Sequence, residues 1–208
     1  MVLASLLLAL DVASLVRDLD HDEYEVRRQA FVELVKAGKA ALPALHEAAR
    51  SGPSLEVRDA AGRIVDRVIE RIRDDFIVER SAEPGMRRCG GLSFESRPHV
   101  ERRLEELAAR LPDCELIVGT FSCMHRAPIC SGTWVSALSR DDGEIFTVWK
   151  QAYREKGLTP GDPALLARHL RPVRDAAEGA ALAELLAGPG ATAEFDADGR
   201  LTGLKKGD

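Results

Sequence analysis

EVRRQA at Glu25–Ala30 and EVRDAA at Glu56–Ala61 are the two stretches that decide the fold of the first third of the chain. They begin 31 residues apart, and each opens a run with apolar residues at i, i+4 and i+8, which lie on one face of a helix. A further apolar segment precedes each stretch, at 12–19 and at 41–48. A period of about 30 residues made of two helices is typical of an α-solenoid. The sequence therefore predicts two helical hairpins over residues 11–78.

These hairpins resemble HEAT-like repeats, especially the short class found in repeat proteins of the phycocyanin-chromophore-lyase type. The resemblance rests on the Glu-Val-Arg-x-x-Ala opening of both second helices and on Ala41–Leu45 (ALPAL) in a first helix. It covers about residues 11–75 and implies a scaffold that binds rather than reacts. It also implies that Asp22, in the turn of the first hairpin, lies near Arg27 or Arg58. No lyase residue is carried over, because none is matched.

The apolar run Val2–Leu10 precedes the hairpins and is too short to cross a bilayer as a helix. It fits the apolar region of a secretory signal, although no Lys or Arg precedes it and no small-x-small cleavage site follows. It equally fits a cap on the helical stack, since two hairpins are fewer than the three or so that a free-standing solenoid needs. The sequence leaves the compartment open between cytoplasm and export.

The second part of the chain differs in composition. Residues 79–98 contain two Pro and three Gly and predict a linker. Residues 99–208 predict a small α+β domain of unknown family with four or five strands, so the expected fold class of the whole chain is α+β. The elements expected are a helix over 100–111, strands over 116–121, 133–138 and 144–150, helices over 164–170 and 172–187, and a closing hairpin over 192–204.

Alternation within the third of these strands makes a finer prediction. It places Ile145, Thr147 and Trp149 on one face of the strand. It places Phe146 and Val148 on the other face. For the helix after Asp162, the Asp-Pro pair predicts a capped start, and Pro172 predicts the start of the next helix.

Charge limits the classes of partner. The net charge is -5 and the pI about 5.6, and such a chain lacks the basic footprint of a nucleic-acid-binding protein. Arg63, Arg67 and Arg71 on the helix that begins near Ser54 are candidate binding residues for an acidic partner. A solvated helix face is the favoured interpretation of this charge, and Asp59 and Arg63 are expected to pair at i, i+4.

Four residues carry the candidate chemistry: Cys114, Cys123, His125 and Cys130. They are weak candidates for a zinc site, because their spacing matches no zinc knuckle. Cys123 and His125 are weak candidates for a catalytic dyad, since side chains two apart on a strand share a face. In an exported protein, a Cys123–Cys130 disulfide is the preferred interpretation.

No Walker-type loop, GxGxxG, HExxH or GxSxG motif occurs in the sequence. We therefore expect a non-enzymatic interaction scaffold that uses no cofactor or metal, binds another protein and has no membrane span. The competing hypotheses are a small thiol-dependent enzyme or hydrolase that uses Cys123 and His125, and an exported structural protein held by disulfides.

Overall fold

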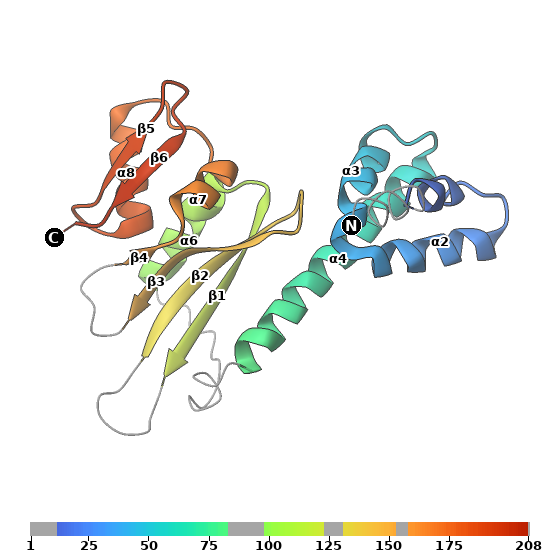
Figure 1. The fold of residues 1–208 in the computed structure, drawn as a ribbon, viewed down its shortest axis with the longest axis horizontal. Coiled ribbons are helices and arrows are strands. Elements are labelled where there is room, and N and C mark those ends of the chain that lie inside the picture. Colours follow the sequence, from blue (N-terminus) through green and yellow to red (C-terminus); the bar gives the residue numbers. More distant parts are fainter. Residues whose placement is uncertain (1–11, 83–97, 123–130, 153–157, 208) are drawn as a thin grey trace, which may run out of the picture. The chain divides into compact units, whose positions relative to one another are not determined.

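A computed structural model describes residues 12–82, 98–122, 131–152 and 158–207 (Figure 1). Contacts between Cα atoms divide the chain into two compact units. We call residues 1–76 with 140–143 the helical unit, and residues 77–139 with 144–208 the sheet unit. The chain is mixed helix and sheet, which agrees with the predicted α+β class. Of the predicted linker over 79–98, residues 79–82 and 98 are helical, and the linker stays a prediction for 83–97, which lie outside the described residues.

Helices follow one another through the helical unit. Residues 12–18 are helical, and then come α2 (Tyr24–Ala37), the 3₁₀ helix η1 (Gly38–Ala41), α3 (Leu42–Ser51) and α4 (Leu55–Ala82). The four α-helical segments coincide with segments expected from the apolar periodicity, whereas η1 was not predicted. Helix α4 continues to Ala82, beyond the predicted end of the hairpins at residue 78, because residues 74–82 contain neither Gly nor Pro.

A continuous apolar stripe fixes the rotation of α4 about its axis. Its members recur three or four residues apart, and none is more than 5% exposed. The charged residues between them are exposed, except Arg58, which is half-buried. The stripe consists of Val57, Ala61, Ile64, Val65, Val68 and Ile69.

The turns of the two hairpins are hydrogen-bonded to each other. The Ser54 hydroxyl donates to the Asp20 carboxylate at 2.7 Å. The same hydroxyl accepts the Val57 N–H at 3.2 Å and so caps the start of α4. One side chain thus satisfies an otherwise unpaired N–H at a helix start and joins the two turns.

Two arginines hold these turns in the same way. Arg27 Nη1 donates to the carbonyl oxygens of His21 at 2.6 Å and Asp22 at 2.8 Å. Arg58 Nη1 donates to the carbonyl oxygen of Gly52 at 2.7 Å. Arg27 is therefore near Asp22, as the resemblance implied, but it binds backbone oxygen atoms. The turn carbonyls supply acceptors that do not depend on the side chain present there.

The described residues of the sheet unit form two antiparallel sheets. The larger has the strand order β1-β2-β3-β4, and β5 and β6 form the smaller, one or two strands more than expected. The bounds are β1 (Cys114–Ser122), β2 (Ser131–Ser139), β3 (Ile145–Ala152), β4 (Thr159–Pro160), β5 (Thr192–Phe195) and β6 (Leu201–Lys205), with helices α6 (Pro98–Arg110), α7 (Pro163–His169) and α8 (Ala176–Ala187).

A bulge corrects the predicted faces of β3. The register between β2 and β3 shifts between Val135 and Ser136, so that Val135 lies opposite Trp149. As a result Trp149 joins Phe146 in the buried core of the sheet unit, and the expected separation of these two side chains onto opposite faces is wrong. Simple alternation fails here because the bulge inserts one residue into the count.

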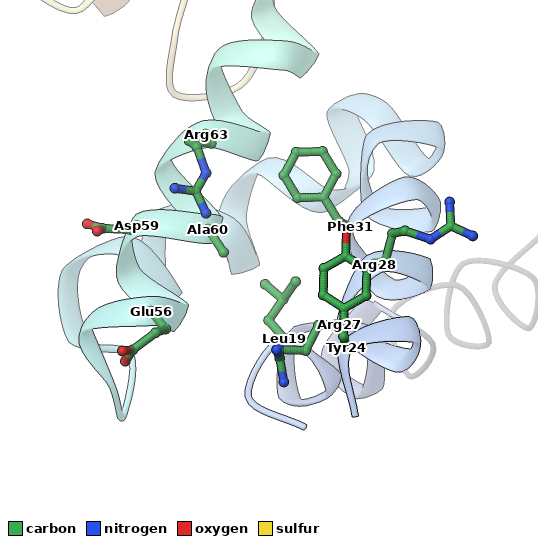
Figure 2. A pocket seen from close by; sticks show the side chains of 9 residues that line it. All are labelled: Leu19, Tyr24, Arg27, Arg28, Phe31, Glu56, Asp59, Ala60 and Arg63. Carbon is green, nitrogen blue, oxygen red and sulfur yellow. The ribbon is translucent and has the colours of Figure 1, made fainter. Parts of the chain in front are cut away.

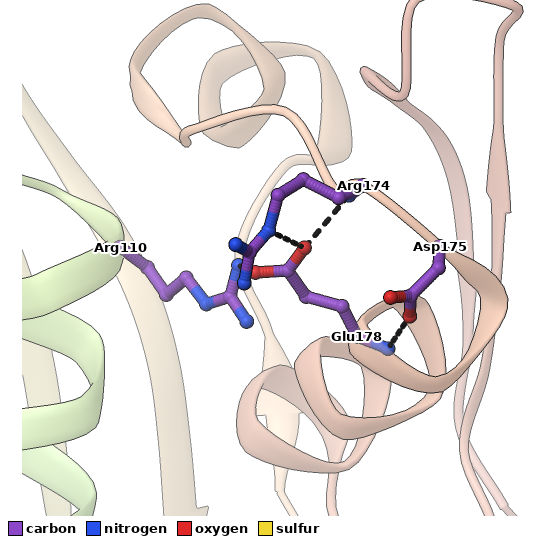
Figure 3. A network of polar contacts seen from close by, with 4 residues as sticks. All are labelled: Arg110, Arg174, Asp175 and Glu178. Carbon is purple, nitrogen blue, oxygen red and sulfur yellow. Dashed lines mark hydrogen bonds and ion pairs between the residues drawn. The ribbon is translucent and has the colours of Figure 1, made fainter.

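Helix α8 begins four residues later than Pro172 predicted. Its cap is Asp175, whose carboxylate accepts the N–H of Glu178 at 2.8 Å (Figure 3). Helix α7 begins as expected, with the Asp162 carboxylate accepting the N–H of Ala164 at 2.9 Å. A side-chain acceptor therefore determines both helix starts in this region.

Glu178 joins the start of α8 to α6. Its carboxylate accepts the backbone N–H of Arg174 at 2.7 Å and the Arg174 guanidinium at 3.2 Å. Its second oxygen accepts Arg110 Nη1, from the end of α6, at 2.5 Å. These donors, the backbone N–H of Arg174 first, lower the pKa of Glu178 from 4.5 to about 2.

The ionisation of Glu178 makes the free energy of unfolding of the sheet unit depend on pH. Because its pKa is lower in the folded protein, its stabilising effect is complete above about pH 4.5 and is lost as the pH falls toward about 2. We expect Glu178→Gln to lower the free energy of unfolding most at neutral pH, and the gap from wild type to close in acid. Urea unfolding followed by tryptophan fluorescence measures this, since Trp134 and Trp149, the two tryptophans of the chain, lie in the sheet unit. A gap that stays constant with pH would contradict the assignment.

Neighbouring positions on α4 give a matched test of the helical unit. Ala61 is fully buried, so Ala61→Glu should destabilise it by about 3 kcal/mol or more, since an unpaired carboxylate would be buried. Gly62 has open space where a Cβ would lie, so Gly62→Ala should stabilise the helix by about 0.5–1 kcal/mol. Denaturation followed by far-ultraviolet circular dichroism measures both. Equal effects of the two substitutions would show that the stripe does not lie as described.

Candidate functional site

The helical unit contains a cavity of about 390 Å³ between α2 and α4 (Figure 2). Each helix contributes four residues spaced i, i+3, i+4 and i+7, which is one helix face. Leu19, from the first turn, completes the wall. The lining residues are Leu19, then Tyr24, Arg27, Arg28 and Phe31 of α2, and Glu56, Asp59, Ala60 and Arg63 of α4.

The apolar part of this pocket comes mainly from the α2 side. Figure 2 shows the side chains of Leu19 and Phe31 in the space between the two helices. Leu19 is only 3% exposed, whereas Tyr24 is 65% exposed. A buried aliphatic wall beside an exposed aromatic ring is the lining expected of a site for an apolar group.

The three arginines of the pocket differ in what they already bind. Arg27 donates to turn carbonyls, and Arg28 Nε pairs with Glu25 at 2.9 Å. Arg63 makes no hydrogen bond or ion pair with any residue that the structure describes. The expected Asp59–Arg63 pair is therefore not formed, and Figure 2 shows the Asp59 carboxylate pointing away from the pocket. Arg63 is thus the guanidinium of this pocket with no donor engaged by a described residue, whereas Arg27 and Arg28 each have one nitrogen engaged.

The other two predicted binding residues lie outside the pocket. Arg67 pairs with Glu70 at 3.1 Å, and Arg71 lies 3.9 Å from Asp75. All four side chains are on the exposed face of α4, where such pairs contribute about 0–1 kcal/mol. Among the three candidates, the structure brings only Arg63 to the pocket.

Most of the predicted chemistry lies outside the described residues. Cys123, His125 and Cys130 all fall within residues 123–130, so the dyad, the zinc site and the disulfide stay predictions. Cys114 begins β1, where it is partly buried and packs against the core of the sheet unit.

The sheet unit also contains a histidine, His169, that belongs to no motif of the sequence. The His169 ring stacks on Phe146, with centroids 4.7 Å apart and planes 12° apart. Its Nε2 lies 3.6 Å from the Glu144 carboxylate, which also pairs with Arg168 at 2.8 Å. Nearby, Ser139 donates its backbone N–H to the Glu144 carbonyl. Ser139 is only 1% exposed, so a substrate could not reach its hydroxyl. The stacked ring of His169 packs the end of α7 against Phe146.

Sequence spacing predicted neither the pocket between α2 and α4 nor the contact between His169 and Glu144. The pocket depends on two helices about 30 residues apart, and the histidine meets its carboxylate across a strand and a helix. Comparisons with known proteins found no matching family model, no similar curated protein and no similar solved structure. Among the described helices, none is both long and apolar enough to span a membrane. The case for function therefore rests on the geometry of the pocket.

Proposed function

We propose that the chain is a non-enzymatic interaction scaffold whose helical unit is a HEAT-like pair of hairpins that binds another protein. The observation that carries this proposal is the pocket between α2 and α4, which combines an apolar wall with a guanidinium whose donors are unused by described residues. Binding surfaces of α-solenoids are formed by neighbouring equivalent helices. A pocket lined by the two second helices suits that use.

Equivalent hydrogen bonds in the two hairpins support a repeat. Arg27 and Arg58 are 31 residues apart, and so are their acceptors His21 and Gly52. In both hairpins a guanidinium on the second helix reaches six residues back to a carbonyl in the turn. Two turns held by the same bond at the same interval are what a duplicated hairpin would produce.

The positions that line the pocket support stacking of these hairpins. Ala30 and Ala61, which match at the repeat interval, are both buried. The pocket residues of α4 lie 32 positions after those of α2, one more than that interval. One residue rotates a helix by about 100°, so the two helices present different flanks of the same repeat. Equivalent helices of neighbouring repeats can face each other only if they present different flanks.

The proposal predicts which substitutions abolish partner binding. Tyr24→Ala should reduce recovery of the partner about tenfold or more, because the exposed ring belongs to the pocket. Val78→Ala is a matched control, since Val78 is 68% exposed and does not line the pocket. Quantitative mass spectrometry of proteins recovered with each variant of the full chain measures the effect.

Cys123→Ser and His125→Ala separate the scaffold from the thiol enzyme. A scaffold should retain its partner in both variants, because neither removes a pocket residue. Removing a nucleophile abolishes a covalent route while binding surfaces stay intact. The proposal fails if recovery depends on Cys123 or His125 but not on Tyr24.

A further inference from the structure

We infer that the pocket between α2 and α4 binds a partner segment carrying a large apolar side chain with a carboxylate on one side of it and a cation on the other. The inference rests on the proposed function and specifies the chemistry of the partner at that site. It follows from three features of the pocket: its volume, the available guanidinium of Arg63, and the placement of two carboxylates along α4.

The volume suits one apolar anchor. About 390 Å³ is near the lower end of the range of ligand sites, which extends from about 300 to 1,000 Å³. A space of this size holds an aromatic or large aliphatic side chain with its adjoining backbone. Leu19, Phe31 and Ala60 supply the apolar surface that such an anchor would cover. Burial of aromatic or aliphatic anchors in pockets commonly dominates the affinity of protein interfaces.

The guanidinium determines the charge beside that anchor. Arg63 lines the pocket and is unengaged by any part of the chain that the structure describes. Arg27 and Arg28 already donate to turn carbonyls and to Glu25. A carboxylate that meets Arg63 at the edge of the apolar wall gains a charge-assisted hydrogen bond without displacing another partner.

Glu56, two turns from Arg63, determines the charge on the other side, and Asp59 lies between them on α4. Neither forms an ion pair with a described residue, and Figure 2 shows both carboxylates pointing outward from the pocket. Glu56 lies seven residues before Arg63, which is about 10 Å along a helix. A ligand carboxylate held at Arg63 is thus separated from Glu56, and a basic group fits at the opposite end. The charges of α4 therefore give the bound segment a direction.

Small fragments test the central part of this inference without a known partner. The probes are 3-phenylpropionate, which joins a ring to a carboxylate, and its neutral amide, which keeps the ring and removes the charge. Titrations of the full chain are followed by the NMR signals of the Ala60 methyl and the Arg63 Nε–H. We expect saturable shifts with both probes, and binding of the carboxylate tighter by about threefold, because an exposed ion pair contributes modestly.

Variants determine which arginine is responsible. Arg63→Gln should abolish the preference for the carboxylate while the amide binds as before. Arg67→Gln, four residues along the same helix and already paired with Glu70, should leave the preference unchanged. A dispersed amide spectrum for each variant shows that its fold is retained.

Three results would overturn the inference: no binding of either probe, equal binding of the two by wild type, or a preference that survives Arg63→Gln. Each can occur while Tyr24→Ala still abolishes partner recovery, in which case the scaffold stands and only the chemistry assigned to its pocket is wrong. If Tyr24→Ala leaves recovery intact while the probes bind as expected, the pocket takes a small molecule and the scaffold proposal fails.

Discussion

Burial of one apolar stripe on α4 is the constraint on which the helical unit depends. Val57, Ala61 and Ile64 are almost completely inaccessible, and the stripe continues to Ile69. Once this stripe faces inward, the rotation of the helix is fixed, and every other side chain on α4 has a determined direction. Glu56, Ala60 and Arg63 then fall on the flank that faces α2. The pocket is a consequence of packing the core.

Several guanidinium groups hold the fold, whereas that of Arg63, in the pocket, is engaged by no described residue. Arg27 and Arg58 satisfy turn carbonyls, and in the sheet unit Arg110 binds the carboxylate of Glu178. Each of these arginines takes the place of water at a polar group. The group is a turn carbonyl for Arg27 and Arg58, and a carboxylate at the start of α8 for Arg110. Arg63 makes no such hydrogen bond or ion pair with a described residue. This contrast, rather than the number of charges on α4, is the reason why Arg63 is proposed as the binding group.

Periodicity was sufficient to predict most of the elements but not the pocket. The apolar spacing in residues 12–78 located the four α-helical segments of the helical unit but not η1, and alternation located the β2–β3 hairpin. What failed was the fine placement: the bulge opposite Val135 changed the face of Trp149, and the Asp175 cap moved the start of α8. Both depend on single local contacts that a periodic pattern averages away.

The pocket and its cation required three-dimensional information. From sequence, Arg63 was one of three equivalent arginines and was expected to pair with Asp59. The structure separates them, because the two side chains leave α4 in different directions (Figure 2). The pairing rule for i, i+4 residues gives a small average energy, and a neighbouring helix easily outweighs it. No rule of spacing identifies which flank of α4 will face α2.

The most direct measurement is photo-crosslinking from the rim of the pocket. A benzophenone side chain introduced at Glu56 would lie beside the proposed site, and one at Glu47, on the exposed surface of α3, would lie on the same unit outside it. The account predicts one dominant protein adduct from position 56 in cells that express the chain, lost with Tyr24→Ala, and none from position 47. Adducts of equal yield from both positions, or from position 47 alone, would contradict it.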